Sequence, residues 1–480
     1  MLRPALIAPL FLGLSLATAA CSDDSTPGAD AGPRDLPADR ALPDAPGEAG
    51  SPASPPAIDG LFEDWQGIAA LAADAAGDAT GGFDVTTVKV ATRGTVVYLY
   101  FDVGKLLNAP SGPAAEGTLR LELTPASGSK LAVDLRGRKA LTDGDKALRW
   151  KEIGYVLAPT HASDRFEGRI DLAAVGGRPG DVVTLELSGS DALDAPASFR
   201  LTGAPHTPST REAGRAAGTA FRVASLNTLY DGLTDGQRGP RLGRLLKAAA
   251  ADIYCFQEVF TAPAAAIASA LTTLDPRGDS ATWTAHKVAD ALVATRGSLK
   301  PVPLQSLSQQ YAGAAVDVDG RSVVVFTLRP PCCGYIGDPS DAQRIAELKA
   351  LAAAIAKLRQ GQLGADLLPY QKAPVVVVGD WNLVGSRTPL DVMLDKSSGP
   401  GLAHLLLRHL RGDDVFTWYQ DELDAFPPGM LDVLVHSPDL TPRRSFVLDT
   451  AELGDATLAK LGLQPDDSQA SDHLMLVADF

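Results

Sequence analysis

Cysteine and positive charge are both scarce in this 480-residue chain. The four cysteines are Cys21, Cys255 and the adjacent pair Cys332 and Cys333, which lack the paired spacing of a zinc site and are too few for a disulfide-dense scaffold. Lys and Arg number 43 against 58 Asp and Glu, a net charge of −15. The composition argues against Cys-ligated zinc, and it gives the whole chain no general attraction for nucleic acid or anionic lipid.

Long apolar runs are absent beyond the first twenty residues. There, Arg3 precedes an apolar run over residues 5–14, and small residues lead from position 17 to Cys21. This arrangement predicts a secretory signal peptide over residues 1–20, because the run is shorter than the ~20 residues of a membrane span. The small residues before Cys21 resemble a bacterial lipobox, with Thr18 where leucine is usual. The resemblance implies a lipoprotein that is lipidated at Cys21 and extracytoplasmic, at the outer membrane or cell surface; plain cleavage and secretion is the alternative.

Aromatic residues are missing from residues 22–56, which are rich in Asp, Pro, Ala, Gly and Ser. Such a segment cannot bury enough apolar surface to offset the entropy lost on ordering. We therefore expect residues 21–56 to be a disordered tether, which would hold the folded part away from a membrane to which Cys21 is attached.

Short β-branched and aromatic runs, separated by Gly and Asp clusters, fill residues 57–203. They predict an all-β sandwich. The phrases AIDGLFEDW, VVYLYFDV and FEGRIDLAAVGGRPGD resemble the DOMON and family 9 carbohydrate-binding-module sandwiches. The resemblance implies a module that binds polysaccharide or a similar ligand. Trp65 then either stacks on a sugar ring or belongs to the core.

Residues 204–220 are small, polar and proline-bearing, which predicts a linker before a second domain over residues 221–480. In that domain strand-like apolar runs alternate with helix-like stretches. It carries 23 basic and 30 acidic residues, so it has no overall positive charge for long nucleic acid.

Polar residues stand where the apolar runs of the second domain end. They are Asn227, Glu258, Asp380, Asn382, Asp432, Asp472 and His473. Several such ends can meet in one cleft, because a buried strand fixes the position of its exposed end. A carboxylate near an amide can accept a proton from water, a histidine can stabilise an oxyanion, and Glu258 suits magnesium. Taken singly, each of these residues could instead have a purely structural role, at the end of a strand or in a turn.

In this order, the phrases FRVASLNTLYDGL, DIYCFQEVF, VVVVGDWNLVGS, FPPGMLDVLVHS and SDHLMLVADF resemble the endonuclease/exonuclease/phosphatase superfamily. The resemblance runs from Phe221 to the C-terminus. It implies a four-layered α/β sandwich, with two central mixed sheets flanked by helices. It also implies cleavage of a phosphoester with a divalent cation, Mg²⁺ or Mn²⁺.

The resemblance further implies roles for single residues. Glu258 is the expected metal ligand, with Asn227 beside it in the metal and phosphate region. Asp380 is expected to activate or orient the attacking water, and Asn382 to hold the phosphate. His473 is expected to contact the phosphate with Asp432 orienting its ring, while Asp472 lies on the metal or water side.

Two departures from the family pattern bear on activity. Leu229 stands where many members have an acidic metal ligand. Members also carry a catalytic histidine after a middle strand, and residues 323–331 contain none. Arg329 in that stretch can neutralise phosphate, but its guanidinium stays charged and is a poor proton donor.

The sequence therefore predicts a secreted or surface-anchored metal-dependent phosphoesterase with an N-terminal binding domain. Nucleic acid, a phospholipid headgroup and a small phosphodiester all remain open as substrates. The alternative is a noncatalytic surface binding lipoprotein whose phosphoesterase domain has lost activity.

Overall fold

A computed structural model describes residues 54–278, 281–304 and 310–480. The predicted signal peptide, the lipidation site at Cys21 and nearly all of the predicted tether lie outside these residues. The described residues belong to one compact unit of the chain. None of the helices in these three ranges is long and apolar enough to cross a membrane.

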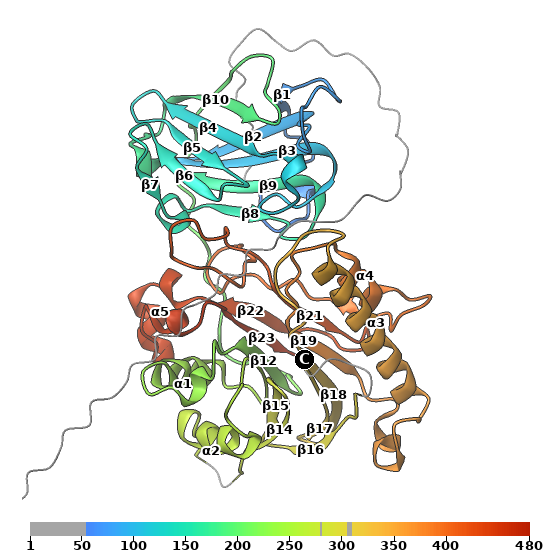
Figure 1. The fold of residues 1–480 in the computed structure, drawn as a ribbon. Coiled ribbons are helices and arrows are strands. Elements are labelled where there is room, and N and C mark those ends of the chain that lie inside the picture. Colours follow the sequence, from blue (N-terminus) through green and yellow to red (C-terminus); the bar gives the residue numbers. More distant parts are fainter. Residues whose placement is uncertain (1–53, 279–280, 305–309) are drawn as a thin grey trace, which may run out of the picture. The chain divides into compact units, whose positions relative to one another are not determined.

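Two antiparallel sheets form the N-terminal part, as expected for a β-sandwich (Figure 1). The first sheet has the order β1 (Ala70–Ala73), β2 (Thr87–Arg93), β3 (Val96–Leu107), β9 (Ser163–Asp171) and β8 (Val156–Ala158). The second has the order β11 (Ala197–Arg200), β10 (Val182–Gly189), β4 (Leu119–Pro125), β5 (Leu131–Asp134), β6 (Lys139–Thr142) and β7 (Ala147–Leu148). In β10, Val183, Leu185 and Leu187 are buried and alternate with more exposed residues, the period of a strand with one face in a core.

Trp65 belongs to the core of this part and is not a sugar-stacking residue. Its side chain is 1% exposed, and its indole Nε1 donates to Glu167 at 2.6 Å. The same carboxylate accepts from the backbone N–H groups of Asp59 and Gly60. The opening phrase AIDGLFEDW is thus held to β9 through one buried acid, which gives the phrase a structural role.

Two six-stranded mixed sheets form the C-terminal part. The first has the order β14 (Thr284–Val288), β15 (Ala291–Thr295), β13 (Ile253–Gln257), β12 (Arg222–Asn227), β23 (Met475–Asp479) and β22 (Arg444–Leu448). The second has the order β16 (Ser298–Pro301), β17 (Tyr311–Val318), β18 (Arg321–Leu328), β19 (Val375–Asp380), β21 (Asp432–His436) and β20 (Ala403–His404). The pairs β12–β13 and β18–β19 are parallel, and the other pairs are antiparallel.

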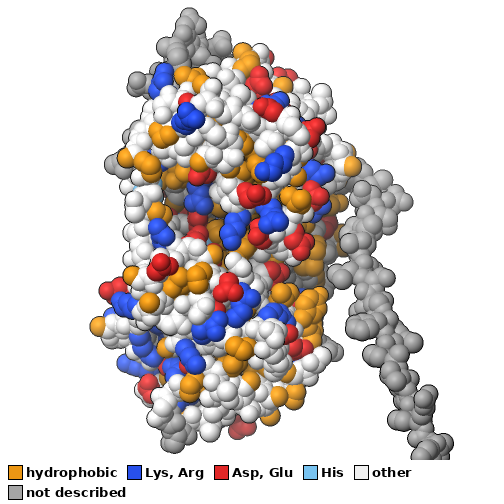
Figure 2. Space-filling model, turned by 90° about the vertical axis from the view of Figure 1, so that its left-hand side faces the viewer, with side chains coloured by type: hydrophobic (Ala, Val, Ile, Leu, Met, Phe, Trp, Pro, Cys, Tyr) orange, Lys and Arg blue, Asp and Glu red, His pale blue; other side chains and the backbone are white. Residues whose placement is uncertain are grey.

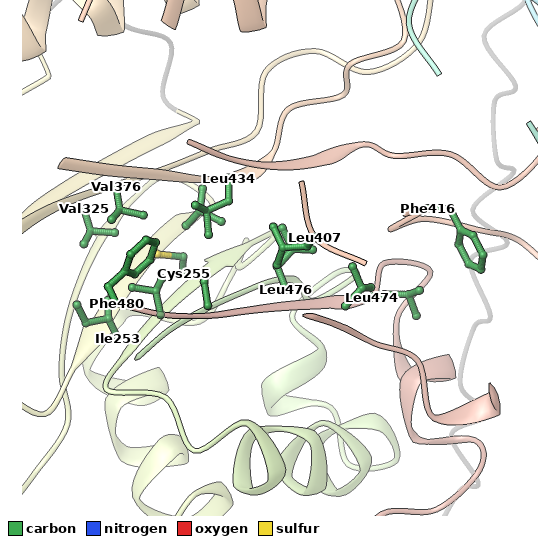
Figure 3. Packing of buried hydrophobic residues seen from close by; sticks show 14 of the residues in the cluster. Ile253, Cys255, Val325, Val376, Leu407, Phe416, Leu434, Leu474, Leu476 and Phe480 are labelled. Carbon is green, nitrogen blue, oxygen red and sulfur yellow. The ribbon is translucent and has the colours of Figure 1, made fainter. Parts of the chain in front are cut away.

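The four valines of β19 divide between two cores. Val376 and Val378 pack in the cluster between the two sheets, with residues such as Ile253, Leu434 and Leu476, which Figure 3 shows pointing toward one another. Val375 and Val377 face the opposite way, into the cluster beneath the helices. A strand buried on both faces reads as a continuous apolar run, which explains the unbroken valines.

Helices cover the outer face of each sheet (Figure 1). The helices α1 (Arg238–Ala249), α2 (Ala264–Leu274) and α5 (Asp455–Leu461) pack on the first sheet. The helices α3 (Pro339–Arg359) and α4 (Thr388–Leu394) pack on the second. The C-terminal part is therefore a four-layered α/β sandwich, which confirms the predicted fold.

The segment predicted as a linker is attached to the C-terminal part. The backbone N–H of Arg211 donates to the carbonyl of Leu410 at 2.7 Å. Ala213 is buried in the core beneath the first sheet, and its carbonyl accepts from the buried guanidinium of Arg222. Residues 211–213 are thus an ordered part of this surface.

Candidate active site

The end of β19 places Asp380 in a buried position at the edge of the second sheet. Asp380 is 2% exposed and follows Gly379, whose Cα lies against the backbone of Leu328 on β18. A Cβ at position 379 would lie 2.5 Å from the carbonyl oxygen of Leu328, so this close strand approach requires glycine. The close packing of β18 and β19 therefore fixes the carboxylate.

His473 lies between two carboxylates. Its Nδ1 lies 2.8 Å from Asp432 Oδ2, and its Nε2 lies 3.8 Å from Asp380 Oδ2. All three side chains are buried. The backbone N–H of Asp432 donates to Thr417 Oγ1 at 2.8 Å, which holds the start of β21 in place. Asp432 therefore holds the Nδ1 side of the imidazole.

The electrostatics of this group favour a cationic histidine beside a basic carboxylate. Burial by itself lowers the pKa of His473, but the negative charges of Asp432 and Asp380 outweigh it and raise that pKa above its usual value. Burial raises the pKa of Asp380, and the nearby Asp432 raises it further, against the opposing effect of His473. A raised carboxylate pKa makes Asp380 a better proton acceptor near neutral pH.

Asn227 connects Asp380 to Glu258. From the end of β12 its Nδ2 donates to Glu258 Oε1 at 3.1 Å and to Asp380 Oδ2 at 3.2 Å. Its Oδ1 accepts from the backbone N–H of Leu229. The amide oxygen is thus already hydrogen-bonded, and Asn227 positions the two acids in this structure.

Asp472 has one oxygen held and one oxygen available. Its Oδ2 accepts from the indole Nε1 of Trp418 at 3.0 Å. Its Oδ1 is buried, and no hydrogen-bond partner for it lies within the described ranges. The indole of Trp418, which the sequence did not indicate, therefore orients this acid in the site.

Arg329 directly follows β18, in the stretch 323–331 where members of the resembled family carry a histidine. Its Nε and Nη2 both contact Asp290 Oδ2, at 2.7 and 2.6 Å. Its Nη1 lies 3.9 Å from Glu258 Oε1, and its guanidinium lies 5.4 Å from the ring centre of Phe260. Asp290 thus fixes the guanidinium of Arg329 at the wall of the site.

Asn382 holds a loop next to the site. Its Nδ2 donates to the carbonyl of Pro330 at 2.9 Å and lies 3.3 Å from Asp380 Oδ2, while its backbone N–H donates to Asp380 Oδ1. Its backbone has a positive φ of 46°, an uncommon conformation that asparagine tolerates. In this structure the amide connects Asp380 to residue 330.

These residues share a pocket of about 320 Å³. Its lining includes Glu258, Arg329, Cys332, Cys333, Asp380, Asn382, Trp418, Asp472 and His473. Three residues of the N-terminal part, Pro110, Ser111 and Thr160, also line it. Thr160 Oγ1 accepts from the backbone N–H of Met430 at 2.7 Å, and Ser111 Oγ donates to the carbonyl of Gly334 at 3.0 Å. The pocket is therefore built by both parts of the chain.

The donors of the pocket fit a hard divalent cation. Glu258 presents a carboxylate to the pocket, and the free Oδ1 of Asp472 is the kind of buried oxygen that a cation satisfies. Asp380, Asp432 and His473 also place one possible ligand atom each within 4.8 Å of one another. In that second group the two acids raise the pKa of His473, which favours the protonated imidazole over a metal-bound one, so we favour the Glu258 and Asp472 side for the metal.

On the face drawn in Figure 2, basic and acidic side chains are interspersed over the surface. Arg329 is the one Lys or Arg among the described residues that line the pocket. This arrangement suits the binding of one phosphate group better than the tracking of a long polyanion.

The structure brings all eight predicted site residues to one region. Asp290 and Trp418, which hold Arg329 and Asp472, were not predicted. Asp290 lies in the turn between β14 and β15, and Trp418 lies in an irregular segment, so neither stands at the end of an apolar run. The pairing of an arginine with an acid 39 positions away carries no local sequence signal.

Comparison with known proteins gives one family. The model described as "Endonuclease/Exonuclease/phosphatase family" matches residues 224–473, just over half of the chain. No curated protein matches. Among solved structures, a humanized TDP2 of D. rerio is 16% identical, with 54% of this chain and 98% of that chain covered and a TM-score of 0.35. The catalytic domain of human Nocturnin with bound sulfate is 18% identical, with 54% and 93% covered and a TM-score of 0.34. Beta toxin of Staphylococcus aureus is 15% identical, with 54% and 99% covered and a TM-score of 0.34.

Proposed function

Because this chain belongs to the endonuclease/exonuclease/phosphatase family, we propose that it is a metal-dependent phosphodiesterase. The observation that carries the proposal is that Asp380 and His473 line the same pocket as Glu258, while Asp432 holds the other ring nitrogen of His473. A proton acceptor, a proton donor and a hard-cation ligand then face one small volume, as hydrolysis of a phosphoester requires.

The residues divide the chemistry between them. Asp380 accepts the proton of the attacking water, which its raised pKa favours. The imidazolium of His473 donates through Nε2 to a phosphoryl oxygen, while Asp432 holds Nδ1. Arg329 offsets the phosphate charge. A Mg²⁺ or Mn²⁺ ion held by Glu258 and Asp472 would supply further charge neutralisation when bound.

The substrate we propose has a good leaving group. Residues 323–331 contain no histidine, and the guanidinium of Arg329 does not release a proton near neutral pH. An aryl phosphodiester needs little proton donation to its leaving oxygen, whereas an alkyl ester depends on it. Among nucleic acid, phospholipid headgroups and small phosphodiesters, we therefore expect fastest turnover of small esters with acidic leaving groups.

Hydrolysis by the full chain tests this proposal. The panel is bis-p-nitrophenyl phosphate, plasmid DNA, RNA and sphingomyelin, with Mg²⁺, with Mn²⁺ and with EDTA. Asp380→Asn is the test variant, and Asp455→Asn, an exposed acid in the first turn of α5, is the matched control. Chelator-sensitive cleavage that falls by roughly 10²–10⁴-fold only in Asp380→Asn supports the enzyme.

A noncatalytic binding protein is the second candidate, and the histidine-free end of β18 favours it. In that case the folded chain would bind Mn²⁺ and inorganic phosphate, but would cleave no member of the panel.

We also propose, from the sequence alone, that the protein is an extracytoplasmic lipoprotein anchored through Cys21. Metabolic labelling with a palmitate analogue, lost in Cys21→Ser, tests that proposal.

Polysaccharide binding by residues 57–203 remains a proposal that rests on the DOMON-like and family 9-like phrases. The burial of Trp65 removes the residue that the sequence offered for sugar stacking. Retention of the full chain on insoluble glycans, compared with bovine serum albumin, tests it. Equal retention of the two proteins on every glycan would remove polysaccharide as a ligand.

A further inference from the structure

Two adjacent thiols form part of the wall of the pocket. Cys332 and Cys333 lie between β18 and α3, both are exposed, and their Sγ atoms lie 2.7 Å apart. Both line the pocket that holds Asp380 and His473. Cys255, by contrast, is fully buried in the core between the sheets. The pair is thus open to small reagents in solution, and Cys255 is not.

The backbone around the pair is firmly held. Nη1 of the fully buried Arg344 donates to the carbonyls of Pro331 and Cys333, both at 2.9 Å. One residue earlier, the carbonyl of Pro330 accepts from Nδ2 of Asn382, which also contacts Asp380. The backbone of the two cysteines is therefore held in place, and hydrogen bonds of Asn382 link the preceding residue, Pro330, to Asp380.

The surroundings activate one of the two thiols. The hydrogen bond from Cys333 lowers the pKa of Cys332 to about 6, against the effect of burial and with help from the charges of Arg329 and Arg344. A lowered pKa favours the thiolate of Cys332, and the thiolate is the form that attacks disulfides. Its negative charge also lies in the wall of a pocket that is proposed to take an anionic substrate.

We propose that Cys332 and Cys333 form a reversible thiol–disulfide switch in the wall of the active-site pocket. The effect on catalysis rests on the proposed function, whereas the chemistry of the pair does not. The oxidant is a small disulfide such as oxidised glutathione. The Cys332 thiolate attacks one of its sulfurs and expels one thiolate. The Cys333 thiol then loses its proton to that thiolate and attacks Cys332 Sγ, expelling the second. Two protein thiols are oxidised, and one small disulfide is reduced to two thiols.

Reversibility follows from the adjacency of the two residues. Neighbouring Cα atoms lie about 3.8 Å apart, closer than the 4.4–6.8 Å usual for disulfides. A bond between them is therefore strained, and strained exposed disulfides are the more easily reduced ones. Such a bond can form and break as the surroundings change.

Oxidation also changes the charge that faces the substrate. The disulfide is neutral, so it removes the thiolate charge that partly cancels the field of Arg329 and Arg344. The oxidised pocket is more positive, and we expect it to bind a phosphate anion more tightly. The expected size is a roughly threefold to tenfold lower Kd for inorganic phosphate, and a similar fall in KM for a phosphodiester.

The experiment compares the reduced and oxidised full chain. Protein reduced with dithiothreitol is equilibrated with oxidised and reduced glutathione at a series of ratios, then alkylated and digested. We expect the peptide with both cysteines to lose two hydrogens without gaining glutathione. Cys332→Ser and Cys333→Ser should each give at most a mixed disulfide. Two unmodified thiols, or two mixed disulfides, at every ratio would overturn the proposal.

Phosphate binding, measured by calorimetry on the same samples, tests the consequence. Oxidised protein should bind inorganic phosphate more tightly than reduced protein. Cys332→Ser lacks the thiolate, so its phosphate affinity should equal that of the oxidised protein and should not change when dithiothreitol is added. Equal phosphate affinity in the two redox states would also overturn the switch. A redox-dependent affinity without hydrolysis of any ester would instead refute the phosphodiesterase and leave the switch standing.

Discussion

Asp380 and Asp432 are directly opposed residues on the antiparallel strands β19 and β21. Like charges in opposed positions destabilise a sheet, and both of these acids are buried. His473 enters from the start of the last strand and lies against both, so its positive charge offsets theirs. The positive charge of His473 therefore stabilises the two buried carboxylates at this short separation.

Replacing that cation should change the pH dependence of activity. In His473→Gln the pKa of Asp380 should rise further, because the opposing effect of the imidazolium is lost. Asp380 works as a carboxylate, so activity falls as pH drops through its pKa, and the acidic limb should move to higher pH. We also expect a loss of kcat of roughly 10²–10³-fold. The pH profile of kcat measures both, and an unmoved acidic limb would show that another group sets it.

Replacing the orienting acid should act through His473. Asp432→Asn keeps the size of the side chain but removes the charge that raises the pKa of His473. We expect kcat to fall by roughly 10–100-fold, with the basic limb of the pH profile moving to lower pH as the imidazolium loses its proton more easily. Metal affinity measured by Mn²⁺ titration should stay within about twofold. A parallel loss of Mn²⁺ binding would instead assign Asp432 to the metal.

Removing the Glu258 charge should separate metal binding from folding. Glu258→Gln keeps one acceptor oxygen, so it can accept from Asn227 Nδ2 or from the backbone N–H of Tyr230 but not from both, and it offers a weaker ligand to a hard cation. We expect saturable Mn²⁺ binding to weaken by roughly 10–100-fold, with only a small fall in melting temperature in the absence of metal from the one lost hydrogen bond. Titration calorimetry measures the affinity, with Asp455→Asn as the control. Unchanged affinity would move the cation to the group of Asp380, Asp432 and His473.

A buried histidine away from the pocket should make stability depend on pH. His409 is fully buried, its Nδ1 lies 2.8 Å from Glu452 Oε2, and its Nε2 lies 2.7 Å from the carbonyl of Phe416. Burial opposes the charge, but Glu452 outweighs it and raises the pKa of His409 to about 9. The folded-state pKa exceeds the unfolded value, so this stabilisation is complete below about pH 6.5 and is lost as pH rises through about 9.

His409→Gln should therefore destabilise the protein more at pH 6 than at pH 10. We expect the difference to be roughly 2–3 kcal/mol. Urea unfolding at both pH values measures it, and His206→Gln, an exposed histidine, is the control. An equal loss of stability at the two pH values would mean that packing rather than charge accounts for the effect.

The sequence was informative where function coincides with regular structure. Asn227 and Asp380 end buried strands and Glu258 directly follows one, and the run of valines before Asp380 marks a strand with cores on both sides. It was less informative where a side chain is held by an irregular or distant segment. Trp418 orients Asp472 from an irregular segment, and Thr160 holds the backbone of Met430, which lies 270 positions away.

The roles of the two amides were also beyond the sequence. Residue type alone cannot say whether an asparagine faces a ligand or a neighbouring side chain. The structure directs the Nδ2 of Asn227 and that of Asn382 toward protein acceptors. Their value to the site is in fixing the carboxylates, which depends on contacts with residues more than 30 positions away.

Because the valines of β19 pack into two separate cores, the position of Asp380 depends on the packing of both. A change of side-chain volume between the sheets would shift Val376 and Val378, and a change beneath α3 and α4 would shift Val375 and Val377. Closely packed interiors pass such changes along a strand, and this strand ends at the proposed proton acceptor. Random mutagenesis scored by activity should therefore recover damaging substitutions on both sides of β19, in layers that never touch the substrate.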